Sequence, residues 1–470
     1  MTWESFDAIV VGAGQAGPAI AERCSREGLR TALVERAAFG GTCVNTGCIP
    51  TKTLVGSARA VHLARRGDEF GFRAGRVHVD FARVMARKDA VVQQSREGVE
   101  HWLRGLQHCE VIQGEARFLA PGVLKVDQRE LRAERIFLNL GARAAHPSVK
   151  GAETVATLDN ASLLAMDTLP RHLVIVGGSY VGLEFAQLMR RFGAKVTVVE
   201  RDERLLPRED EDIALAIQRM LEAEGVRFEL GAECIALGQV SKGISVGTRC
   251  QRPAPRLLAS HVLLALGREP NTQHIGLELA GIQTDERGYI HVDEQCRTSA
   301  EGVWAVGECN GRGGFTHTAW NDHEVVVANL FDGEARRIGE RIPAYALFTD
   351  PPLGRVGLNE AQARQSGRRL LTASLPMSRV GRAREAGETL GLMKVVADAD
   401  SRELLGASLL GYRCDEAVHG LLDLMTLQQP VDALVRSMPI HPTVSELLPT
   451  LLKALKPAGP AVEARPPGAA

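Results

Sequence analysis

Two segments of the chain share the same order of apolar and polar positions. Residues 6–36 read FDAIVVGAGQAGPAIAERCSREGLRTALVER, and residues 171–201 read RHLVIVGGSYVGLEFAQLMRRFGAKVTVVER. In each, an apolar run meets closely spaced glycines, a stretch with apolar residues at helical spacing follows, and a second apolar run ends in Glu-Arg. The pattern predicts a strand, a helix and a parallel strand, and its gapless repetition predicts two such βαβ units.

The glycines of both segments fit a turn that binds a dinucleotide. The first glycine makes the tight turn, the second lets the backbone approach a pyrophosphate, and the third lets the helix pack closely on the strand. Ser179 replaces the second glycine in the later copy. The acid that ends each second strand can accept a hydrogen bond from a ribose hydroxyl. The candidate residues are Gly12, Gly14, Gly17 and Glu35 in the first copy, and Gly177, Gly178, Gly182 and Glu200 in the second.

A second pair of similar segments supports two separate nucleotide-binding units. Residues 134–147 (ERIFLNLGARAAHP) and 260–272 (SHVLLALGREPNT) are apolar runs that end in Leu-Gly at Gly141 and Gly267. We expect each to return a strand to its own sheet, with its glycine near the cofactor. Two dinucleotides in one chain imply electron transfer between them, and the natural pair is a flavin and a nicotinamide dinucleotide.

The composition excludes some other classes of protein. Of 470 residues, 45% are hydrophobic and 24% are charged, and 56 Lys and Arg balance 57 Asp and Glu. No basic run is present, so we expect no nucleic-acid partner. The N-terminal sequence lacks the pattern of a signal peptide and no apolar run approaches 18 residues, so we expect a cytoplasmic protein with no membrane partner.

One pair of the nine cysteines stands close together, and we interpret the other seven as thiols without a chemical role. Cys43 and Cys48 lie in GGTCVNTGCIPTK. Their spacing disfavours zinc, because no second pair or Cys/His box follows, but it leaves a structural disulfide and a redox pair open. A helix that starts near Thr42 would place them at its positive end, which favours a thiolate, with Lys52 one turn further on.

The repeat and the cysteine segment together resemble the FAD-dependent pyridine nucleotide-disulfide oxidoreductases, over nearly the whole chain. The resemblance implies FAD and NAD(P)H as cofactors and a redox-active disulfide beside the flavin. Cys48 would be the thiol that contacts the isoalloxazine and forms the charge-transfer thiolate, and Cys43 the thiol that attacks the substrate. Glu35 would hold the FAD ribose. Lys52 would pair with Glu184, and Tyr180 would cover the nicotinamide pocket.

Two later motifs extend the resemblance. GVWAVGECNGRGGFTHTAWNDHEVV (302–326) is similar to the family's second FAD motif, with Glu308 where the family has an Asp that binds the ribityl chain. In MPIHPTVSELLPTLLKAL (438–455), His441 matches the acid/base that enters the active site of the partner in a homodimer, and Glu446 matches the residue that holds its ring.

The predicted architecture is α/β, with two Rossmann-like domains and a C-terminal α+β domain that forms the dimer interface. From about Arg341, two adjacent prolines, an N-cap-like Asn359 and two strands joined by a polar turn mark this third domain. We expect the first FAD-binding part at 1–150, the NAD(P)-binding domain at 151–274, the second FAD-binding part at 275–340, the interface domain at 341–456 and a disordered tail at 457–470.

The predicted reaction passes electrons from NAD(P)H through FAD to the Cys43–Cys48 disulfide, and then to a small-molecule disulfide or a soft metal ion. The sequence looks most like the mercuric reductase-like branch, although no cysteine follows Cys414 to deliver mercury. Dihydrolipoyl dehydrogenase and glutathione reductase are alternatives, as is an NADH oxidase or nucleotide-binding flavoprotein with an idle dithiol. Glu200 favours NADH, whereas the nearby Arg201 and Arg204 argue for NADPH.

Overall fold

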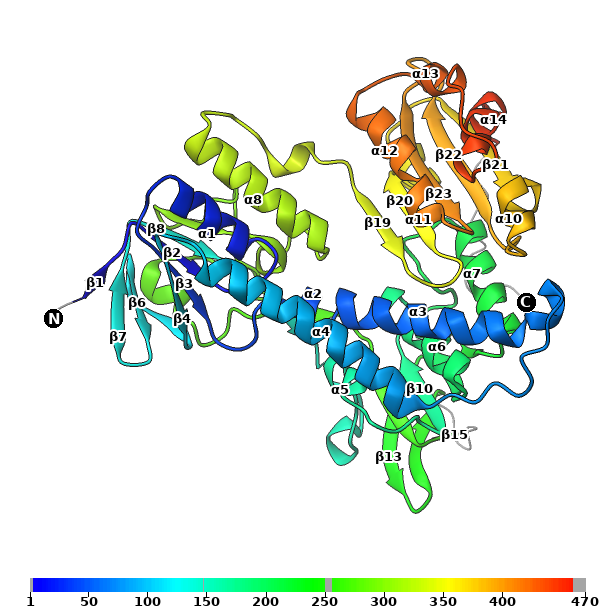
Figure 1. The fold of residues 1–470 in the computed structure, drawn as a ribbon, viewed down its shortest axis with the longest axis horizontal. Coiled ribbons are helices and arrows are strands. Elements are labelled where there is room, and N and C mark those ends of the chain that lie inside the picture. Colours follow the sequence, from blue (N-terminus) through cyan, green and yellow to red (C-terminus); the bar gives the residue numbers. More distant parts are fainter. Residues whose placement is uncertain (1–2, 147, 250–255, 460–470) are drawn as a thin grey trace. The chain divides into compact units, whose positions relative to one another are not determined.

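The computed structural model describes residues 3–146, 148–249 and 256–459 (Figure 1). Within it the chain forms two compact units. The first unit comprises Met1–Arg201 and Arg227–Arg341, and the second comprises Asp202–Val226 and Ile342–Ala470. The second part of the second unit begins at Ile342, next to the predicted start of the interface domain at residue 341. Residues 202–226, which we expected in the NAD(P)-binding domain, belong to the second unit.

The first βαβ repeat forms a parallel sheet in the first unit. Its strand order is β18-β8-β2-β3-β4, and all neighbours are parallel. All residues of β2 and β3 are buried, as expected for strands covered on both faces. The helix that joins them is α1 (Gly17–Arg26). The strands are β2 (Ala8–Val11), β3 (Thr31–Glu35), β4 (Cys109–Gln113), β8 (Arg135–Leu138) and β18 (Val303–Ala305).

The second repeat forms its own parallel sheet, with the strand order β12-β11-β10-β16. The joining helix is α6 (Tyr180–Phe192). The strands are β10 (His172–Val176), β11 (Lys195–Val199), β12 (Arg227–Glu229) and β16 (His261–Leu264). Both predicted βαβ units are therefore present, and β8 and β16 return to the two sheets as the sequence indicated.

The remaining elements of the first unit support these sheets. The helices α3 and α4 run side by side (Figure 1). Three small sheets have the orders β1-β7-β6-β5, β13-β14-β15 and β17-β9. The strands are β1 (Glu4–Ser5), β5 (Ala116–Ala120), β6 (Val123–Val126), β7 (Arg129–Arg132), β9 (Ala142–Ala144), β13 (Ala236–Val240), β14 (Gly243–Gly247), β15 (Arg256–Ala259) and β17 (Arg268–Pro270). The helices are α2 (Gly41–Asn45), α3 (Cys48–Arg65), α4 (Phe81–Arg104), α5 (Asn160–Leu164) and α8 (Thr316–Phe331), with short 3-10 turns at Gly67–Phe70, Ala152–Thr154, Leu277–Ala280, Gly307–Asn310 and Ile338–Glu340.

The second unit is built on a six-stranded antiparallel sheet in the order β19-β20-β23-β22-β21-β24. The predicted cap is present, because the Asn359 side chain accepts a hydrogen bond from the backbone N–H of Gln362. The strands are β19 (Ala344–Leu347), β20 (Leu353–Gly357), β21 (Leu370–Pro376), β22 (Leu392–Asp398), β23 (Leu404–Leu410) and β24 (Lys456–Pro457). The helices are α7 (Glu211–Ala223), α9 (Glu360–Gln365), α10 (Gly381–Glu385), α11 (Cys414–Ala417), α12 (His419–Thr426), α13 (Val431–Val435) and α14 (Leu448–Lys453), with 3-10 turns at Met377–Arg379 and Ser445–Leu447.

The start of the C-terminal tail is ordered. Lys456 and Pro457 pair with Thr372 and Leu371 of β21, so the disorder predicted from residue 457 does not begin there. The predicted tail from residue 460 onward lies outside the described residues.

Candidate active site

The glycine turns of the two repeats have nearly the same backbone. Gly12 and Gly177 have φ angles of +105° and +112°, a region that suits glycine. A Cβ on Gly17 would lie 2.0 Å from the carbonyl oxygen of Gly12, and a Cβ on Gly182 would lie 2.1 Å from that of Gly177. Both turns therefore require the predicted glycines, and both leave an open backbone cradle of the kind that a pyrophosphate fills.

The acids that end the second strands face these turns. Glu35 Oε2 accepts a hydrogen bond from the backbone N–H of Ala13 at 2.7 Å, and Glu200 Oε2 accepts one from Gly178 at 2.6 Å. Each carboxylate thus orients its glycine turn, a contact that the sequence did not indicate. A carboxylate oxygen has lone pairs to spare, so this bond is compatible with the predicted bond to a ribose hydroxyl.

Asn139, at the end of β8, joins the first glycine turn to the second FAD motif. Its Oδ1 accepts from the backbone N–H of Gly17 at 3.1 Å, and its Nδ2 donates to the carbonyl of Val306 at 3.2 Å. Sequence reasoning missed this residue, because nothing distinguishes an Asn at a strand end from one in an ordinary turn.

The predicted glycines after the two return strands lie at opposite ends of a small sheet. Gly141 and Gly267 directly precede β9 and β17, which pair antiparallel. Both have positive φ angles. The two glycines thus flank one connection between the nucleotide-binding sheets, and their contact with a cofactor stays a prediction.

The two thiols lie where a short helix gives way to a long one. Cys43 is in α2, which ends at Asn45. Thr46 and Gly47 are not helical, and Cys48 is the first residue of the 18-residue helix α3. Both are half-buried free thiols. Cys48 therefore lies at the positive end of a long helix, close to the position that the sequence predicted.

The two thiols differ in proton affinity. The hydrogen bond from the Cys43 thiol, together with Thr316 and the charge of Lys52, outweighs burial and lowers the pKa of Cys48 to about 6. The same hydrogen bond and burial raise the pKa of Cys43. Near neutral pH the pair therefore consists of a Cys48 thiolate and a Cys43 thiol.

Thr316 is a contact of Cys48 that the sequence did not reveal. It is the first residue of α8, and its Oγ1 lies 3.2 Å from the Cys48 sulfur, so its hydroxyl can donate to the thiolate. The two residues are 268 positions apart, and only the tertiary fold brings them together.

The predicted pair of charges between the two nucleotide-binding regions is present. Lys52 Nζ lies 2.8 Å from Glu184 Oε2, and the Glu184 side chain is only 8% exposed. Lys52 is on α3 and Glu184 is on α6. The pair thus connects the thiol-bearing helix with the helix of the second repeat.

The cysteine loop is fastened by an asparagine and an arginine. Asn45 donates from Nδ2 to the carbonyl oxygens of Phe39 and Gly41, each at 2.9 Å. Arg96 on α4 donates from Nε to Asn45 Oδ1 at 2.9 Å. These bonds fix the turn that presents Cys43, and neither residue was singled out from the sequence.

Glu308 of the second FAD motif is held by an arginine. Arg268 donates to both carboxylate oxygens, with an Nη2 to Oε2 distance of 2.9 Å, and also donates to the carbonyl of Ala142. The carboxylate is thus fixed by a fork of two bonds. The buried Asp322 stabilises the turn of this motif, because its Oδ2 accepts a hydrogen bond from the backbone N–H of Gly307 at 2.8 Å.

His441 and Glu446 form the predicted pair in the second unit. His441 Nδ1 lies 2.8 Å from Glu446 Oε2, and the His441 side chain is 79% exposed. Because Nδ1 bonds to the half-buried Glu446 and the ring is exposed, Nε2 can face a reacting group. The thiols belong to the first unit.

Tyr180 is the first residue of α6 and is half-buried. This position, directly after the glycine turn of the second repeat, is compatible with its predicted place beside the nicotinamide.

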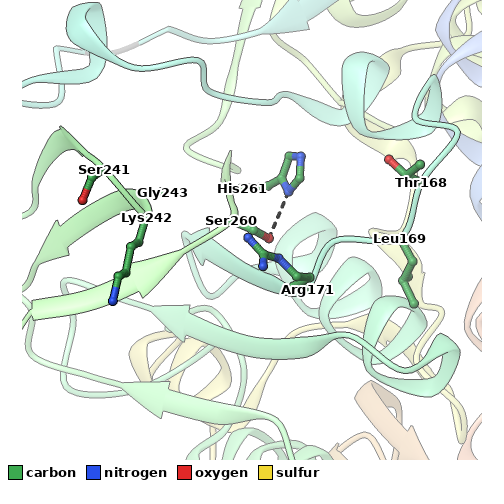
Figure 2. Close-up of a pocket in the computed structure, with 8 residues that line it drawn as sticks. All are labelled: Thr168, Leu169, Arg171, Ser241, Lys242, Gly243, Ser260 and His261. Atoms are coloured by element: carbon green, nitrogen blue, oxygen red, sulfur yellow. Dashed lines mark hydrogen bonds between the residues drawn. The ribbon is translucent and has the colours of Figure 1, made fainter.

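A surface pocket in the second repeat is separate from these residues. Figure 2 shows its lining, which includes Arg171, Lys242, Ser260 and His261, around a cavity of about 460 Å³. Arg171 precedes β10 and His261 begins β16, so the pocket lies at the amino ends of the parallel strands. Nucleotides bind beyond the carboxyl ends, where the glycine turn lies, and this pocket is therefore not the cofactor site.

The other cysteines fall into two groups. Burial raises the pKa of five of them, which suits inert thiols: Cys24, Cys109, Cys296, Cys309 and Cys414. Cys234 is disulfide-bonded, which corrects its interpretation as a single thiol, and Cys250 lies outside the described residues. Among the residues that the structure describes, no group of His, Cys, Asp and Glu is arranged to hold a metal ion. No helix within residues 3–146, 148–249 and 256–459 is long and apolar enough to cross a membrane.

Comparison with known proteins identifies the family. Residues 6–322 match the pyridine nucleotide-disulphide oxidoreductase family, and residues 343–452 match the dimerisation domain of that family. The chain belongs to the pyridine nucleotide-disulfide oxidoreductases. It is an FAD-dependent enzyme of class I of this family, and its cofactors are FAD and NAD(P)H.

Several relatives align over nearly the whole chain. The probable pyridine nucleotide-disulfide oxidoreductase RclA of Escherichia coli is 35% identical, over 96% of this chain and 99% of its own. Dihydrolipoyl dehydrogenase 2 of Haloarcula marismortui is 34% identical, over 93% and 94%. Mercuric reductase of Lysinibacillus sphaericus is 28% identical, over 94% and 81%. Among solved structures, the Cu(II) complex of the HOCl-induced flavoprotein disulfide reductase RclA of Escherichia coli superposes with a TM-score of 0.88 at 34% identity, over 96% of this chain and 99% of that one.

Proposed function

We propose that the enzyme passes electrons from NAD(P)H through FAD to the Cys43–Cys48 disulfide, and from the resulting dithiol to a small-molecule disulfide or a soft metal ion. The observation that supports this most is the unequal pair of thiols. Cys48, at the start of α3, has a pKa lowered to about 6 by Cys43, Thr316 and Lys52, while Cys43 keeps its proton. A structural disulfide has no need for such an arrangement.

The residues of the chain account for the first half of the reaction. FAD supplies the two-electron chemistry that links a nicotinamide to a disulfide. The residues proposed to hold it are the first glycine turn, Glu35 and Glu308. Two electrons and one proton open the Cys43–Cys48 disulfide and leave a thiolate on Cys48 and a thiol on Cys43. The hydroxyl of Thr316 and the charge of Lys52 stabilise the new negative charge.

The second half with a disulfide substrate follows from thiol exchange. His441 of a partner subunit takes the Cys43 proton, the Cys43 thiolate attacks one substrate sulfur, and His441 returns the proton to the departing thiolate. Cys48 then attacks Cys43 in the mixed disulfide. The second substrate thiolate leaves and takes up a proton from water, and the Cys43–Cys48 disulfide is restored.

A soft metal ion is the second candidate substrate. Thiolates are ligands for soft ions, and RclA, a relative of 35% identity, has been solved as a Cu(II) complex. Two Cu(II) ions each accept one electron from the reduced pair and become Cu(I), while Cys43 loses its one proton and the sulfurs of Cys43 and Cys48 form the disulfide. One Hg(II) ion would accept the same two electrons. The His441–Glu446 pair favours the disulfide reaction, because metal reduction releases protons without needing one returned to a leaving group.

The coenzyme and the assembly are part of the proposal. The dimerisation domain supports a homodimer, in which His441 of each subunit enters the active site of the other. Glu200 accepts from the backbone of the second glycine turn, and a 2′-phosphate beside its carboxylate would be repelled. We therefore favour NADH over NADPH.

A substrate panel tests the proposal. The purified FAD-loaded protein is assayed with NADH and with NADPH against lipoamide, glutathione disulfide, Cu(II) and Hg(II)-thiol, alongside Cys43→Ser and Cys48→Ser proteins. We expect turnover of a disulfide or a metal by wild type, loss of it in both variants, and preserved reduction of a dye that takes electrons from the flavin. Undiminished turnover by both variants would show that the dithiol is idle.

A further inference from the structure

The loop that contains His441 is held by an arginine from a separate helix. Arg382, on α10, donates from Nε and Nη2 to the carbonyl oxygen of Pro442, at 3.1 and 2.8 Å. Pro442 directly follows His441. A guanidinium that directs two donors at one carbonyl fixes that peptide in position and in orientation.

Apolar packing holds only one end of this loop. Val444 and Leu448 are buried in the core of the second unit. On the other side, Met438 is 95% exposed and Ile440 is 79% exposed. Within one subunit, the exposed end has little apolar contact to fix it, so polar bonds in that subunit set the position of His441.

Bonds inside the loop hold its shape but do not fasten it to the sheet. The Thr443 hydroxyl donates to the carbonyl of Ile440 at 2.8 Å, and the backbone N–H of Glu446 donates to Thr443 Oγ1 at 3.2 Å. His441 bonds to Glu446 within the same loop. The bond from Arg382 comes from another element, and it therefore sets the direction of the loop as a whole.

The start of α10 also lies beside the carboxylate of the pair. A Cβ on Gly381 would be 3.7 Å from Glu446 Oε1, ordinary contact distance. Arg382 itself also pairs with Glu385 one turn on, at 3.4 Å, which orients its stem. One short helix thus lies next to Glu446 and bonds to the peptide that follows His441.

We propose that Arg382 is a positioning residue that aims the His441–Glu446 pair at the thiol of a partner subunit. The inference rests on the proposed function, because it assigns His441 the transfer of the Cys43 proton. Arg382 touches neither substrate nor thiol, and acts through the Pro442 peptide. Loss of its two bonds lets the exposed end of the loop sample other directions, and misplacement of a catalytic group by about 1 Å can cost about 100-fold in rate.

The test uses the full-length, FAD-loaded protein reduced with NADH, and iodoacetamide as the probe of Cys43. Five variants are compared with wild type: Arg382→Met, Arg382→Lys, Arg384→Met, His441→Ala, and Arg382→Met combined with His441→Ala. Arg384 is an exposed arginine on the same helix and serves as the matched control. The rate of Cys43 alkylation is followed from pH 5 to 9, together with the rate at which NADH produces the long-wavelength absorption of the Cys48 thiolate.

The expected results separate positioning from folding. Arg382→Met should slow alkylation about 10- to 100-fold near neutral pH, toward the His441→Ala rate, because the base no longer reaches the thiol. Arg382→Lys should recover part of the rate, since one donor replaces two. Arg384→Met should match wild type, and NADH should produce the Cys48 absorption within about twofold of the wild-type rate in every variant. Combining Arg382→Met with His441→Ala should slow alkylation no further than His441→Ala alone.

Each contrary result has a distinct meaning. If His441→Ala alkylates as fast as wild type, the acid/base role in the proposed function is wrong. If His441→Ala is slow and Arg382→Met is not, only the role of Arg382 is wrong. Loss of the NADH-dependent absorption in Arg382→Met, or further slowing in the double variant, would show that the arginine acts on the fold and would overturn the inference.

Discussion

The two βαβ repeats agree in backbone and differ in one side chain that secures the glycine turn. The residue after each return strand donates its backbone N–H to the strand that begins the repeat, from Asn139 to Val11 and from Ala265 to Val176, both at 2.8 Å. In the first repeat the Asn139 side chain also bonds to Gly17 and to Val306. In the second, Ala265 has no polar side chain to do so.

We propose that this difference reflects different tasks of the two repeats, with FAD bound at the first and the nicotinamide at the second. A flavin that stays bound through many turnovers benefits from a turn tied to the second FAD motif. A nicotinamide that must leave after each turnover needs only the backbone cradle, with Glu200 to orient it. The same pattern of strand, turn and helix would then retain FAD in the first copy and exchange the nicotinamide in the second.

The largest expected effect comes from replacing, in each repeat, the glycine that lets the helix pack against the glycine turn. Gly17→Ala and Gly182→Ala place a methyl group 2.0 and 2.1 Å from a backbone oxygen, which forces the helix away from the strand. Overpacking of this kind costs up to about 3 kcal/mol, or roughly 100-fold in affinity. Gly17→Ala should purify largely without flavin, while Gly182→Ala should be yellow but poorly reduced by NADH. Flavin absorbance measures the bound FAD, and stopped-flow kinetics measure the rate of reduction by NADH. Equal flavin loss in the two variants would show that the two glycine turns do not differ in this way.

The ion pair that connects the two repeats should give the next largest effect. Lys52→Met removes a charge that lowers the pKa of Cys48 and leaves the buried Glu184 without this partner, at a cost of about 2 to 3 kcal/mol. We expect a lower melting temperature and a Cys48 thiolate that forms only at higher pH. Lys52→Met with Glu184→Gln should regain stability but not the thiolate, as thermal unfolding and the pH titration of the reduced enzyme will show. An unchanged titration in Lys52→Met would mean that its charge does not act on Cys48.

Substitution of Asn139 tests directly whether this side chain accounts for the difference between the repeats. Asn139→Ala removes two buried hydrogen bonds and leaves the N–H of Gly17 without this acceptor, which costs about 1 to 3 kcal/mol. FAD should dissociate about tenfold more readily, as measured by the recovery of flavin fluorescence on dilution. The reciprocal change, Ala265→Asn, should leave FAD binding unaltered. If Asn139→Ala retains FAD as wild type does, the side chain does not explain the difference between the repeats.

The smallest expected effect is at the thiolate itself. Thr316→Val removes the hydroxyl 3.2 Å from Cys48 while it keeps the shape of the side chain. A net hydrogen bond of about 1 kcal/mol corresponds to somewhat less than one pKa unit. The pH midpoint of the thiolate absorption should rise by that amount. A midpoint that stays the same would show that Thr316 does not donate to the thiolate.

Local pattern predicted much of the fold and part of the site. Glycine spacing and apolar runs indicated both βαβ units, and the position of Cys48 near a helix start followed from the residues alone. The resemblance added the Lys52–Glu184 and His441–Glu446 pairs. The residues that were missed act across long separations. Thr316 is 268 positions from Cys48, and Arg382 is 60 positions from Pro442. Such contacts have no local signal, because each depends on how separate elements pack.

An anaerobic titration of the FAD-loaded protein with NADH at several pH values tests most directly whether NADH opens the Cys43–Cys48 disulfide and leaves a thiolate on Cys48. We expect a long-wavelength absorption band to appear as the disulfide opens. Because the pKa of Cys48 is lowered to about 6, the band should be full at pH 8, half lost near pH 6 and absent well below it, as the thiolate gains a proton. Cys43→Ser should keep the band and Cys48→Ser should lack it. A wild-type protein that shows no band, or a Cys48→Ser protein that shows one, would contradict the account.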